Sequence, residues 1–246
     1  MVVRGSAVPD LAFERSFAAQ GHRFVAGCDE VGRGALAGPV SVGLVVVDLD
    51  SVRALRKVRD SKLLNPAERT ALVPRIRRWA SACAVGHASA AEIDDVGLVA
   101  ALRLAGERAW HEVCLTVVPQ AVVLDGNHDW LSRDWQGELF GAETGSGPGD
   151  GCAAPVTTRI KADLQCLSVA AASVLAKVER DQLMNDLAGG YPPYGWQVNK
   201  GYGTAGHRAA IDAHGATAEH RRSWRLGSLE RINVERMDVA ERLGGG

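Results

Sequence analysis

The sequence predicts an α/β fold in which helices flank a mixed β-sheet and a helical segment follows at the carboxyl end. Three observations support this prediction. Residues 24–28 and 40–47 are short apolar runs, which are typical of buried strands. Residues 98–113 carry apolar side chains at helical spacing. Residues 167–187 form a long run rich in Ala, Ser and Leu, without Gly or Pro, which favours a long helix.

The first two strands surround an acidic, glycine-rich turn, and a hairpin is expected. The first strand should end directly before the adjacent carboxylates Asp29 and Glu30. Because successive strand side chains point to opposite faces, these acids can serve one centre only if the backbone distorts directly after Asp29. Gly32 and Gly34 permit such a distortion, and they allow backbone N–H groups to approach a ligand closely. The alternative is a hairpin whose acids are only solvated.

The segments on either side of this hairpin carry local signals. Residues 1–20 are weakly patterned, and we expect a short helix or a loose tail there. Asn65, Pro66 and Glu68 together are typical of a helix start with a capping box, and Pro74 should kink or end that helix. The other expected elements are a basic helix near 51–57, a strand over 81–88, a capping box over 89–92 and a short helix over 93–96 that Gly97 ends.

Two further acids follow apolar runs. Residues 121–124 form a buried strand that delivers Asp125 to the turn Asp125-Gly126-Asn127, although a solvated turn Asp is the common alternative. A short strand over 156–160 leads through Lys161-Ala162 to Asp163, at the start of the long helix. Asp163 could equally be a cap that complements the helix macrodipole.

The remaining segments are rich in Gly, Pro and polar residues. We predict a long mobile loop over 128–155, whose acids Asp129, Asp134, Glu138 and Glu143 are solvated and do not bind metal. Residues 191–204 contain too much Pro and Gly for regular structure. Thr204 should cap a helix that runs through residue 213 and stops at Gly215, and a short helix and frayed end should follow.

Composition bounds the class of protein. The 246 residues are 46% hydrophobic and 23% charged with a net charge of −1, as in an ordinary globular domain. No run of about 18 apolar residues and no secretory signal is found, so we expect a cytoplasmic protein without a membrane span. The five scattered cysteines predict neither a zinc site nor a disulfide framework. Basic residues crowd 53–78 and 200–225, where they either bind phosphates or form solvated helix faces.

The acids Asp29, Glu30, Asp125 and Asp163 suggest a metal centre, because gathered carboxylates repel one another without cations. Oxygen ligands with few nearby histidines suit Mg²⁺ or Mn²⁺. Two such ions about 3.5 to 4 Å apart can activate a water and steady the leaving oxygen in phosphodiester hydrolysis. The alternative is that the four acids are turn and cap residues that never meet.

Several motifs then match one family in order. They are Asp-Glu-Val-Gly-Arg-Gly at 29–34, Asp-Ser-Lys at 60–62, Asp-Gly-Asn at 125–127, Lys-Ala-Asp at 161–163, the helical run at 168–181 and Lys-Gly-Tyr-Gly-Thr at 200–204. The chain resembles bacterial type 2 ribonuclease H (ribonuclease HII) over most of residues 23–226. It departs from that pattern at Leu63, where the family commonly has a second lysine, and at Ala162, where the family has glycine.

This resemblance implies a ribonuclease H-like fold and a metal-dependent endonuclease. The expected enzyme hydrolyses RNA in RNA/DNA hybrids and cuts on the 5′ side of a ribonucleotide embedded in duplex DNA, leaving 3′-hydroxyl and 5′-phosphate ends. Asp29 would be shared by two metal ions, with Glu30, Asp125 and Asp163 completing the ligands.

The resemblance also implies the substrate-binding residues. Gly32, Arg33 and Gly34 would read the 2′-hydroxyl. Tyr202 would pack on the neighbouring sugar, and Lys62 would contact a phosphate. Nucleic acid is therefore the expected partner of a protein that we expect to be a monomer.

The resemblance divides the chain into an N-terminal tail (1–20), a catalytic domain (21–226) with a core to about residue 190 and a helical substrate-binding segment over 191–226, and a C-terminal helix and tail (227–246). Three alternatives stay open. Type 3 ribonuclease H has an additional N-terminal domain, for which the roughly twenty residues before the first strand leave little room. A catalytically inactive hybrid-binding module would not need four acids, and a phosphatase for small phosphoesters would not need the 2′-hydroxyl motif.

Overall fold

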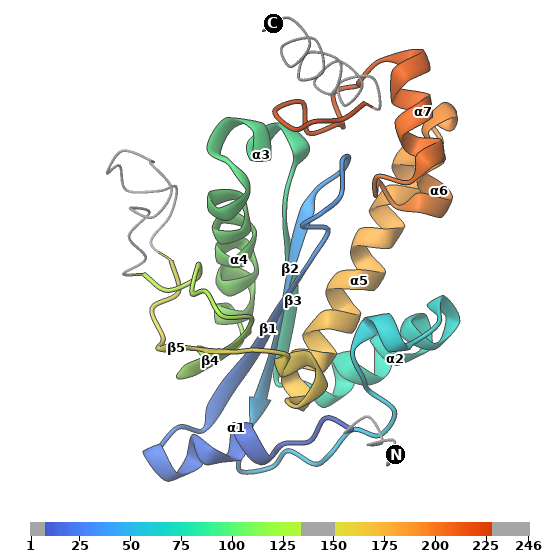
Figure 1. Ribbon diagram of the computed structural model, residues 1–246. Helices are drawn as coiled ribbons and strands as arrows, with labels where there is room; N and C mark the ends of the chain where they lie inside the picture. Colours follow the sequence, from blue (N-terminus) through green and yellow to red (C-terminus); the bar gives the residue numbers. More distant parts are fainter. Residues whose placement is uncertain (1–7, 134–150, 228–246) are drawn as a thin grey trace, which may run out of the picture.

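A five-stranded mixed sheet lies at the centre of the computed structural model, which describes residues 8–133 and 151–227 (Figure 1). The strand order is β3-β2-β1-β4-β5. β1 pairs antiparallel with β2, and β2 with β3, whereas β4 runs parallel to both β1 and β5. The α/β prediction with a mixed sheet is therefore confirmed. The strands are β1 (Phe24–Val31), β2 (Val40–Asp48), β3 (Ala82–Ala88), β4 (Ala121–Asp125) and β5 (Val156–Arg159).

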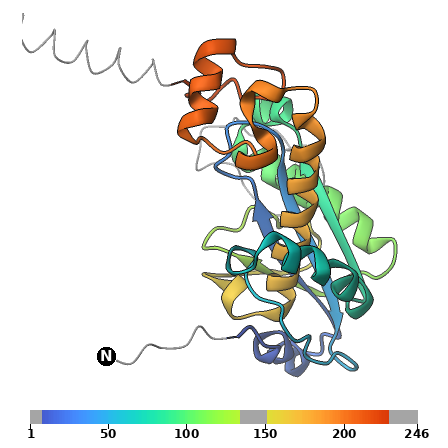
Figure 2. The same cartoon turned by 90° about the vertical axis from the view of Figure 1, so that its right-hand side faces the viewer.

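Helices cover both faces of the sheet, as Figures 1 and 2 show. α3 (Ala90–Val96) and α4 (Leu98–Cys114) lie on one face, and α2 (Pro66–Trp79) and α5 (Leu167–Ala188) lie on the other. A Cβ atom on Gly27 would collide with the Ser168 backbone, and one on Gly43 with the Ala172 carbonyl. These two strand glycines therefore let α5 lie unusually close to β1 and β2.

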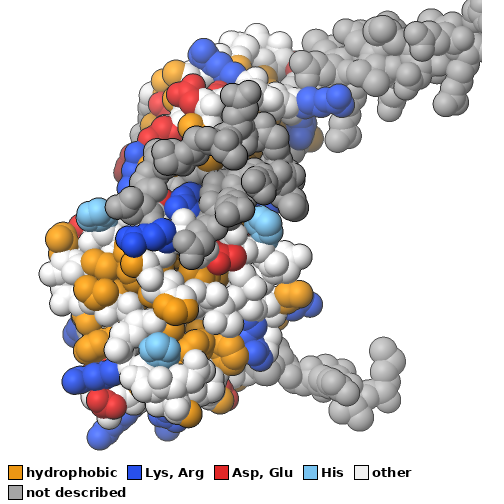
Figure 3. Space-filling view, turned by 90° about the vertical axis from the view of Figure 1, so that its left-hand side faces the viewer, with side chains coloured by type: hydrophobic (Ala, Val, Ile, Leu, Met, Phe, Trp, Pro, Cys, Tyr) orange, Lys and Arg blue, Asp and Glu red, His pale blue; other side chains and the backbone are white. Residues whose placement is uncertain are grey.

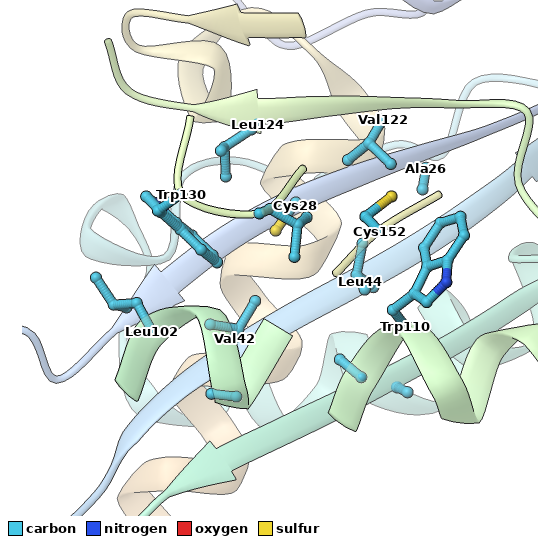
Figure 4. Close-up of a cluster of buried hydrophobic side chains, with 14 of the residues drawn as sticks. Ala26, Cys28, Val42, Leu44, Leu102, Trp110, Val122, Leu124, Trp130 and Cys152 are labelled. Carbon is cyan, nitrogen blue, oxygen red and sulfur yellow. The ribbon is translucent and has the colours of Figure 1, made fainter. Parts of the chain in front are cut away.

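The apolar core lies on both sides of the sheet. Figure 4 shows the cluster beneath α4, which contains Cys28 and Leu44 of the sheet and Trp110 of the helix. Trp130 and Cys152, from the ends of the segment that the sequence assigned to a mobile loop, are buried in the same cluster. Those two ends are therefore packed, whereas residues 134–150 and the acids Asp134, Glu138 and Glu143 lie outside the described residues.

Most local signals are confirmed. Asn65 and Glu68 form the capping box of α2, and Ser89 and Glu92 form that of α3. Thr204 caps α7 (Ala205–His214) by accepting from the His207 N–H. Each helix start depends on contacts within four residues, which explains why the sequence alone predicts it.

Pro74 does not end α2, which continues five residues past it, and the alternative of a kink stays a prediction. Three other local predictions are wrong. Residues 51–57 form turns and irregular chain instead of a basic helix. The segment 191–204 is partly regular, because it holds a 3₁₀ turn at Pro192–Tyr194 and the one-turn helix α6 (Trp196–Asn199). β1 does not stop at residue 28 but runs to Val31, since its pairing with β2 continues through Val31 and Ser41.

The first described residues pack onto the sheet and α5. They form α1 (Ala12–Ser16) and a 3₁₀ turn at Ala18–Gln20, and Leu11 and Phe17 are buried. The buried Glu14 carboxylate accepts hydrogen bonds from the N–H and hydroxyl of Ser168, both at 2.8 Å. Glu14 thereby caps the amino end of α5, where the macrodipole favours a negative charge.

The face that carries α4 is shown in Figure 3. Hydrophobic side chains gather in its lower half, and lysines and arginines are scattered over its visible part. Leu115 and Val118, which follow α4, are exposed. None of the described helices is both long and apolar enough to cross a membrane.

Candidate active site

Three of the predicted acids meet at the edge of the sheet where the parallel strands end. Cys28 of β1 pairs with Leu124 of β4, so the next residues, Asp29 and Asp125, lie side by side in register. Asp163 lies in the 3₁₀ turn Ala162–Leu164 that follows β5. Because β1, β4 and β5 are parallel, their carboxyl ends share this edge.

Glu30 reaches the site from the other face of β1. Asp29 pairs with Gly43 and shares its α5 face, whereas Glu30 shares the face of Cys28, in the cluster beneath α4. The expected backbone distortion after Asp29 is absent, since the ladder with β2 is continuous through Val31. The two acids are nevertheless close enough for the charge of Glu30 to raise the pKa of Asp29.

Burial and mutual repulsion dominate the electrostatics of these acids. Asp29 is 6% exposed, and burial raises the pKa of its carboxyl well above the usual range, with further increases from Glu30, Asp125 and Asp163. Burial likewise raises the pKa of Glu30 and of Asp163. A site that makes carboxylates this hard to ionise favours a cation beside them.

Some of this negative charge is balanced by the chain itself. Arg33 Nη1 lies 3.3 Å from Glu30 Oε1, and Lys62 Nζ donates to Asp163 Oδ2 at 3.4 Å. Asp125 Oδ1 accepts from the Ala162 N–H at 2.6 Å. Lys62 is therefore placed beside the acids, with a side chain that is 75% exposed and free to turn toward a ligand.

The four acids offer carboxylate oxygens, which are the kind of ligand that Mg²⁺ and Mn²⁺ bind. Glu30 Oε2 is buried and has no hydrogen-bond partner, which is costly for a carboxylate oxygen unless a cation meets it. As the side chains lie, no group of three or more acidic, histidine or cysteine residues within 8–133 and 151–227 could hold an ion. Arg33 is paired with Glu30 and Lys62 with Asp163, so a cation at these acids would compete with two ion pairs of the chain.

A glycine-rich loop (residues 32–38) borders the acids. Gly32 has a φ of 86°, and a Cβ atom there would fall within the guanidinium of Arg180. A Cβ atom on Gly34 would meet no protein atom within 4 Å. Tyr202 joins this loop through a β-bridge to Ala35, and its ring is 5.4 Å from Arg180 Cζ. Arg33, Gly34 and Tyr202 are therefore neighbours that are at least partly exposed, whereas Gly32 is buried against Arg180.

Sequence reasoning missed several residues that support this arrangement. Asp60 is buried and lies 3.8 Å from Lys62 Nζ. Ser173 of α5 donates to the Ser61 hydroxyl at 2.9 Å, and it acts to lower the pKa of Asp29, against the effect of burial. Arg180 and Arg221 are fully buried beneath the loop. In the sequence, Arg180 is only one residue of the helical motif 168–181, and Arg221 is only one residue of a basic segment. A solvated arginine could occupy either position, so the sequence does not predict that they are buried.

The model of the family described as Ribonuclease HII matches residues 26–227. The chain belongs to the ribonuclease HII family. Ribonuclease HII from Streptomyces avermitilis is 43% identical over 217 residues, which cover 88% of this chain and 83% of the relative. Ribonuclease HII from Ruegeria sp. is 41% identical, with 90% and 86% covered.

Solved structures agree with the ribonuclease HII assignment. Ribonuclease H2 from Pyrococcus horikoshii is similar with a TM-score of 0.58 and 25% identity, covering 91% of this chain and all of that protein. Ribonuclease HII from Archaeoglobus fulgidus, solved in a complex with PCNA, has a TM-score of 0.60 and 27% identity, covering 82% and 96%.

Family membership decides between the alternatives that the sequence left open. This ribonuclease HII is a ribonuclease H, an endonuclease that acts on RNA/DNA hybrids, and the fold is ribonuclease H-like. The type 3 enzyme, the inactive binding module and the phosphatase are therefore set aside. Position 162 can hold alanine in place of the glycine common in the family, because the backbone at Ala162 does not take a positive φ. The residue in this segment that does so is Lys161, with a φ of 58°.

Proposed function

We propose that the protein cuts duplex DNA on the 5′ side of an embedded ribonucleotide, leaving 3′-hydroxyl and 5′-phosphate ends, as well as hydrolysing RNA in long hybrids. The single observation that carries the proposal is the position of the glycine-rich loop directly beside Asp29, Asp125 and Asp163. β1 carries Asp29, whose carboxylate can assist phosphodiester hydrolysis, and it ends at Val31, directly before the glycine-rich loop. The backbone of that loop can recognise a ribose, so the two functions lie next to each other on the chain.

The acids would hold two divalent ions, Mg²⁺ or Mn²⁺. Asp29, on the central strand of the five-stranded sheet, would be shared, and Glu30, Asp125 and Asp163 would each contribute oxygen atoms. When bound, such ions supply a nucleophile at neutral pH and stabilise the leaving oxygen. The unpartnered Glu30 Oε2 supports this role, because a cation would satisfy it.

The chain's own cations would move to the substrate. Lys62 and Arg33 are held by Asp163 and Glu30 in ion pairs of 3.4 and 3.3 Å. If those acids held metal ions, Lys62 and Arg33 would no longer be needed to balance their charge and could contact phosphates. Tyr202 would pack on the sugar next to the ribonucleotide, and Gly34 would let the backbone reach the 2′-hydroxyl without a side chain between them.

The test is cleavage of an end-labelled DNA duplex that contains one ribonucleotide, with Mg²⁺, with Mn²⁺ and with a chelator. We expect one metal-dependent cut 5′ to the ribonucleotide, and its loss in Asp125→Asn. An all-DNA duplex of the same sequence is the control. Cleavage of a long RNA/DNA hybrid without any cut at the single ribonucleotide would overturn the proposed junction specificity, and equal cleavage in the chelator would overturn the metal role.

A further inference from the structure

Two buried arginines support the glycine-rich loop from below. Arg221 donates from Nη2 to the Gly32 carbonyl at 2.6 Å and from Nη1 to the Arg33 carbonyl at 2.9 Å, and it also reaches the Gly38 carbonyl. Arg180 donates to the carbonyls of Pro39, Ala37 and Lys200. Both side chains are fully buried, and each of their guanidinium nitrogens donates to this short loop or its neighbours.

Neither arginine forms an ion pair with a carboxylate in residues 8–133 and 151–227. Burying a guanidinium without a carboxylate partner is expensive, and it lowers the pKa of Arg221 to about 9, with Arg180 adding to the effect. Apolar side chains could fill the same space at less cost. The two arginines are therefore better explained by what they do to the loop than by what they add to the core.

Arg221 fixes the direction of two particular peptide groups. The described peptide bonds are all trans, and in a trans peptide the N–H points away from the C=O. The peptide whose carbonyl is Gly32 carries the N–H of Arg33, and the one whose carbonyl is Arg33 carries the N–H of Gly34. Since Arg221 draws both carbonyls inward, it turns both N–H groups outward.

Those two N–H groups have no acceptor in the described protein. The space on the Gly34 side is also open, because an added Cβ would meet no atom within 4 Å. By contrast, the next N–H groups along the loop are used, from Ala35 to Gly32 and from Leu36 to Gly201. The Arg33 and Gly34 N–H groups are therefore adjacent donors without an acceptor in the described part of the chain, and Arg221 holds the carbonyl of each of their two peptides.

We propose that Arg221 is a positioning residue that determines ribonucleotide specificity by aiming the Arg33 and Gly34 N–H groups at the substrate, and that Arg180 braces the far end of the same loop. This inference rests on the proposed function, since it assumes that the loop reads the 2′-hydroxyl. Lysine cannot replace Arg221, because a single ammonium cannot hold two carbonyls in the fixed fork of a guanidinium.

The test measures binding instead of cleavage, in an Asp125→Asn background. Fluorescence anisotropy gives the dissociation constants for a duplex with one ribonucleotide and for the same duplex made of DNA alone. We expect the parent to prefer the ribonucleotide by about tenfold, as one hydrogen bond allows, and Arg221→Lys to reduce that ratio to about one or two. Arg180→Lys should reduce it in the same direction.

Arg222→Lys is the matched control, because Arg222 is the next residue, is exposed and donates from its side chain to the Thr217 carbonyl, which lies outside the loop. It should leave the ratio of the two affinities as in the parent. A ratio that survives in both Arg221→Lys and Arg180→Lys overturns this inference alone. A parent without any preference overturns the proposed junction specificity and the inference with it.

A second measurement covers the case in which both buried variants fail to fold. In the folded, ¹⁵N-labelled parent, the amide resonances of Arg33 and Gly34 should shift more with the ribonucleotide duplex than with the all-DNA duplex. Equal shifts with the two duplexes would overturn the inference without any variant of Arg221 or Arg180.

Discussion

Gly32 and Gly34 stand two residues apart in one motif, but their surroundings differ, and alanine at each position tests the different roles that we propose for them. In Gly32→Ala the φ of 86° would place alanine in a region that costs about 1–2 kcal/mol. The new Cβ would also displace the Arg180 guanidinium, which donates to three carbonyls. Losing even one such charged hydrogen bond costs about 1.5–3 kcal/mol. We therefore expect a total loss of about 3–5 kcal/mol of unfolding free energy.

Gly34→Ala should leave the stability nearly unchanged. Its φ is outside the positive region, and the added methyl meets no atom of the protein. The free energy of unfolding should then change by at most about 0.5 kcal/mol. The methyl would instead stand between the loop and the substrate, and we expect kcat/KM on a single embedded ribonucleotide to fall by about tenfold or more.

Thermal unfolding and cleavage of the two variants, measured side by side, check this reasoning. About 2–4 °C of melting temperature per kcal/mol applies to a chain of this size, so Gly32→Ala should melt about 10 °C lower and Gly34→Ala within about 2 °C of the wild type. Equal destabilisation by the two substitutions, or normal cleavage by Gly34→Ala, would refute the assignment of Gly32 to packing and of Gly34 to substrate contact.

Three further predictions concern the acids, the junction and a buried histidine. Asp29→Asn and Asp125→Asn should each reduce cleavage at least about a thousandfold while circular dichroism stays unchanged, and a variant with near-normal cleavage removes that residue from the site. Tyr202→Ala should reduce kcat/KM on a single ribonucleotide about tenfold more than on a long hybrid, and an equal loss on both substrates contradicts its role at the junction. The pKa of His220 is lowered to about 4, chiefly by burial, whereas an unfolded histidine titrates near 6.5. The unfolded state therefore binds more protons, and at most about 3 kcal/mol of stability should be lost as the pH falls from 6.5 to 4. Unfolding measured against pH should show a smaller loss in His220→Asn, whose side-chain oxygen can still accept from the Thr217 N–H, and the same loss in both proteins would contradict this origin.

The same histidine illustrates a network that depends on the fold. His207 Nδ1 faces the Tyr202 carbonyl at 3.0 Å and therefore carries its proton, so Nε2 accepts from the Trp196 indole at 3.0 Å. His220 Nδ1 accepts from the Thr217 N–H, so its other nitrogen donates to His207 at 3.2 Å. Both rings are neutral in this arrangement, and an extra proton on either would face a donor. The network fixes α6 and α7 beside Tyr202.

The sequence by itself determined the features that depend on near neighbours. The caps of α2, α3 and α7 follow from Asn65, Ser89 and Thr204, because each side chain bonds within its own first turn. The buried strands follow from apolar runs, and the acids at their ends follow from where those runs stop. The family motifs extend this local information to the candidate site residues, including Tyr202.

Only the tertiary structure decided what distant segments do to one another. β1 continues past Asp29 because β2 pairs with it, so Glu30 reaches the site from the opposite face. Nothing in the local sequence distinguishes Arg221 and Arg180 from solvated arginines. They are buried because α5 and residues 217–226 pack against the loop. Burial depends on contacts between segments nearly two hundred residues apart, as in the bond from Arg221 to Gly32, with a separation of 189. No local pattern encodes such a contact, and for that reason the sequence predicted the candidate acids but not the two arginines that are buried against the loop.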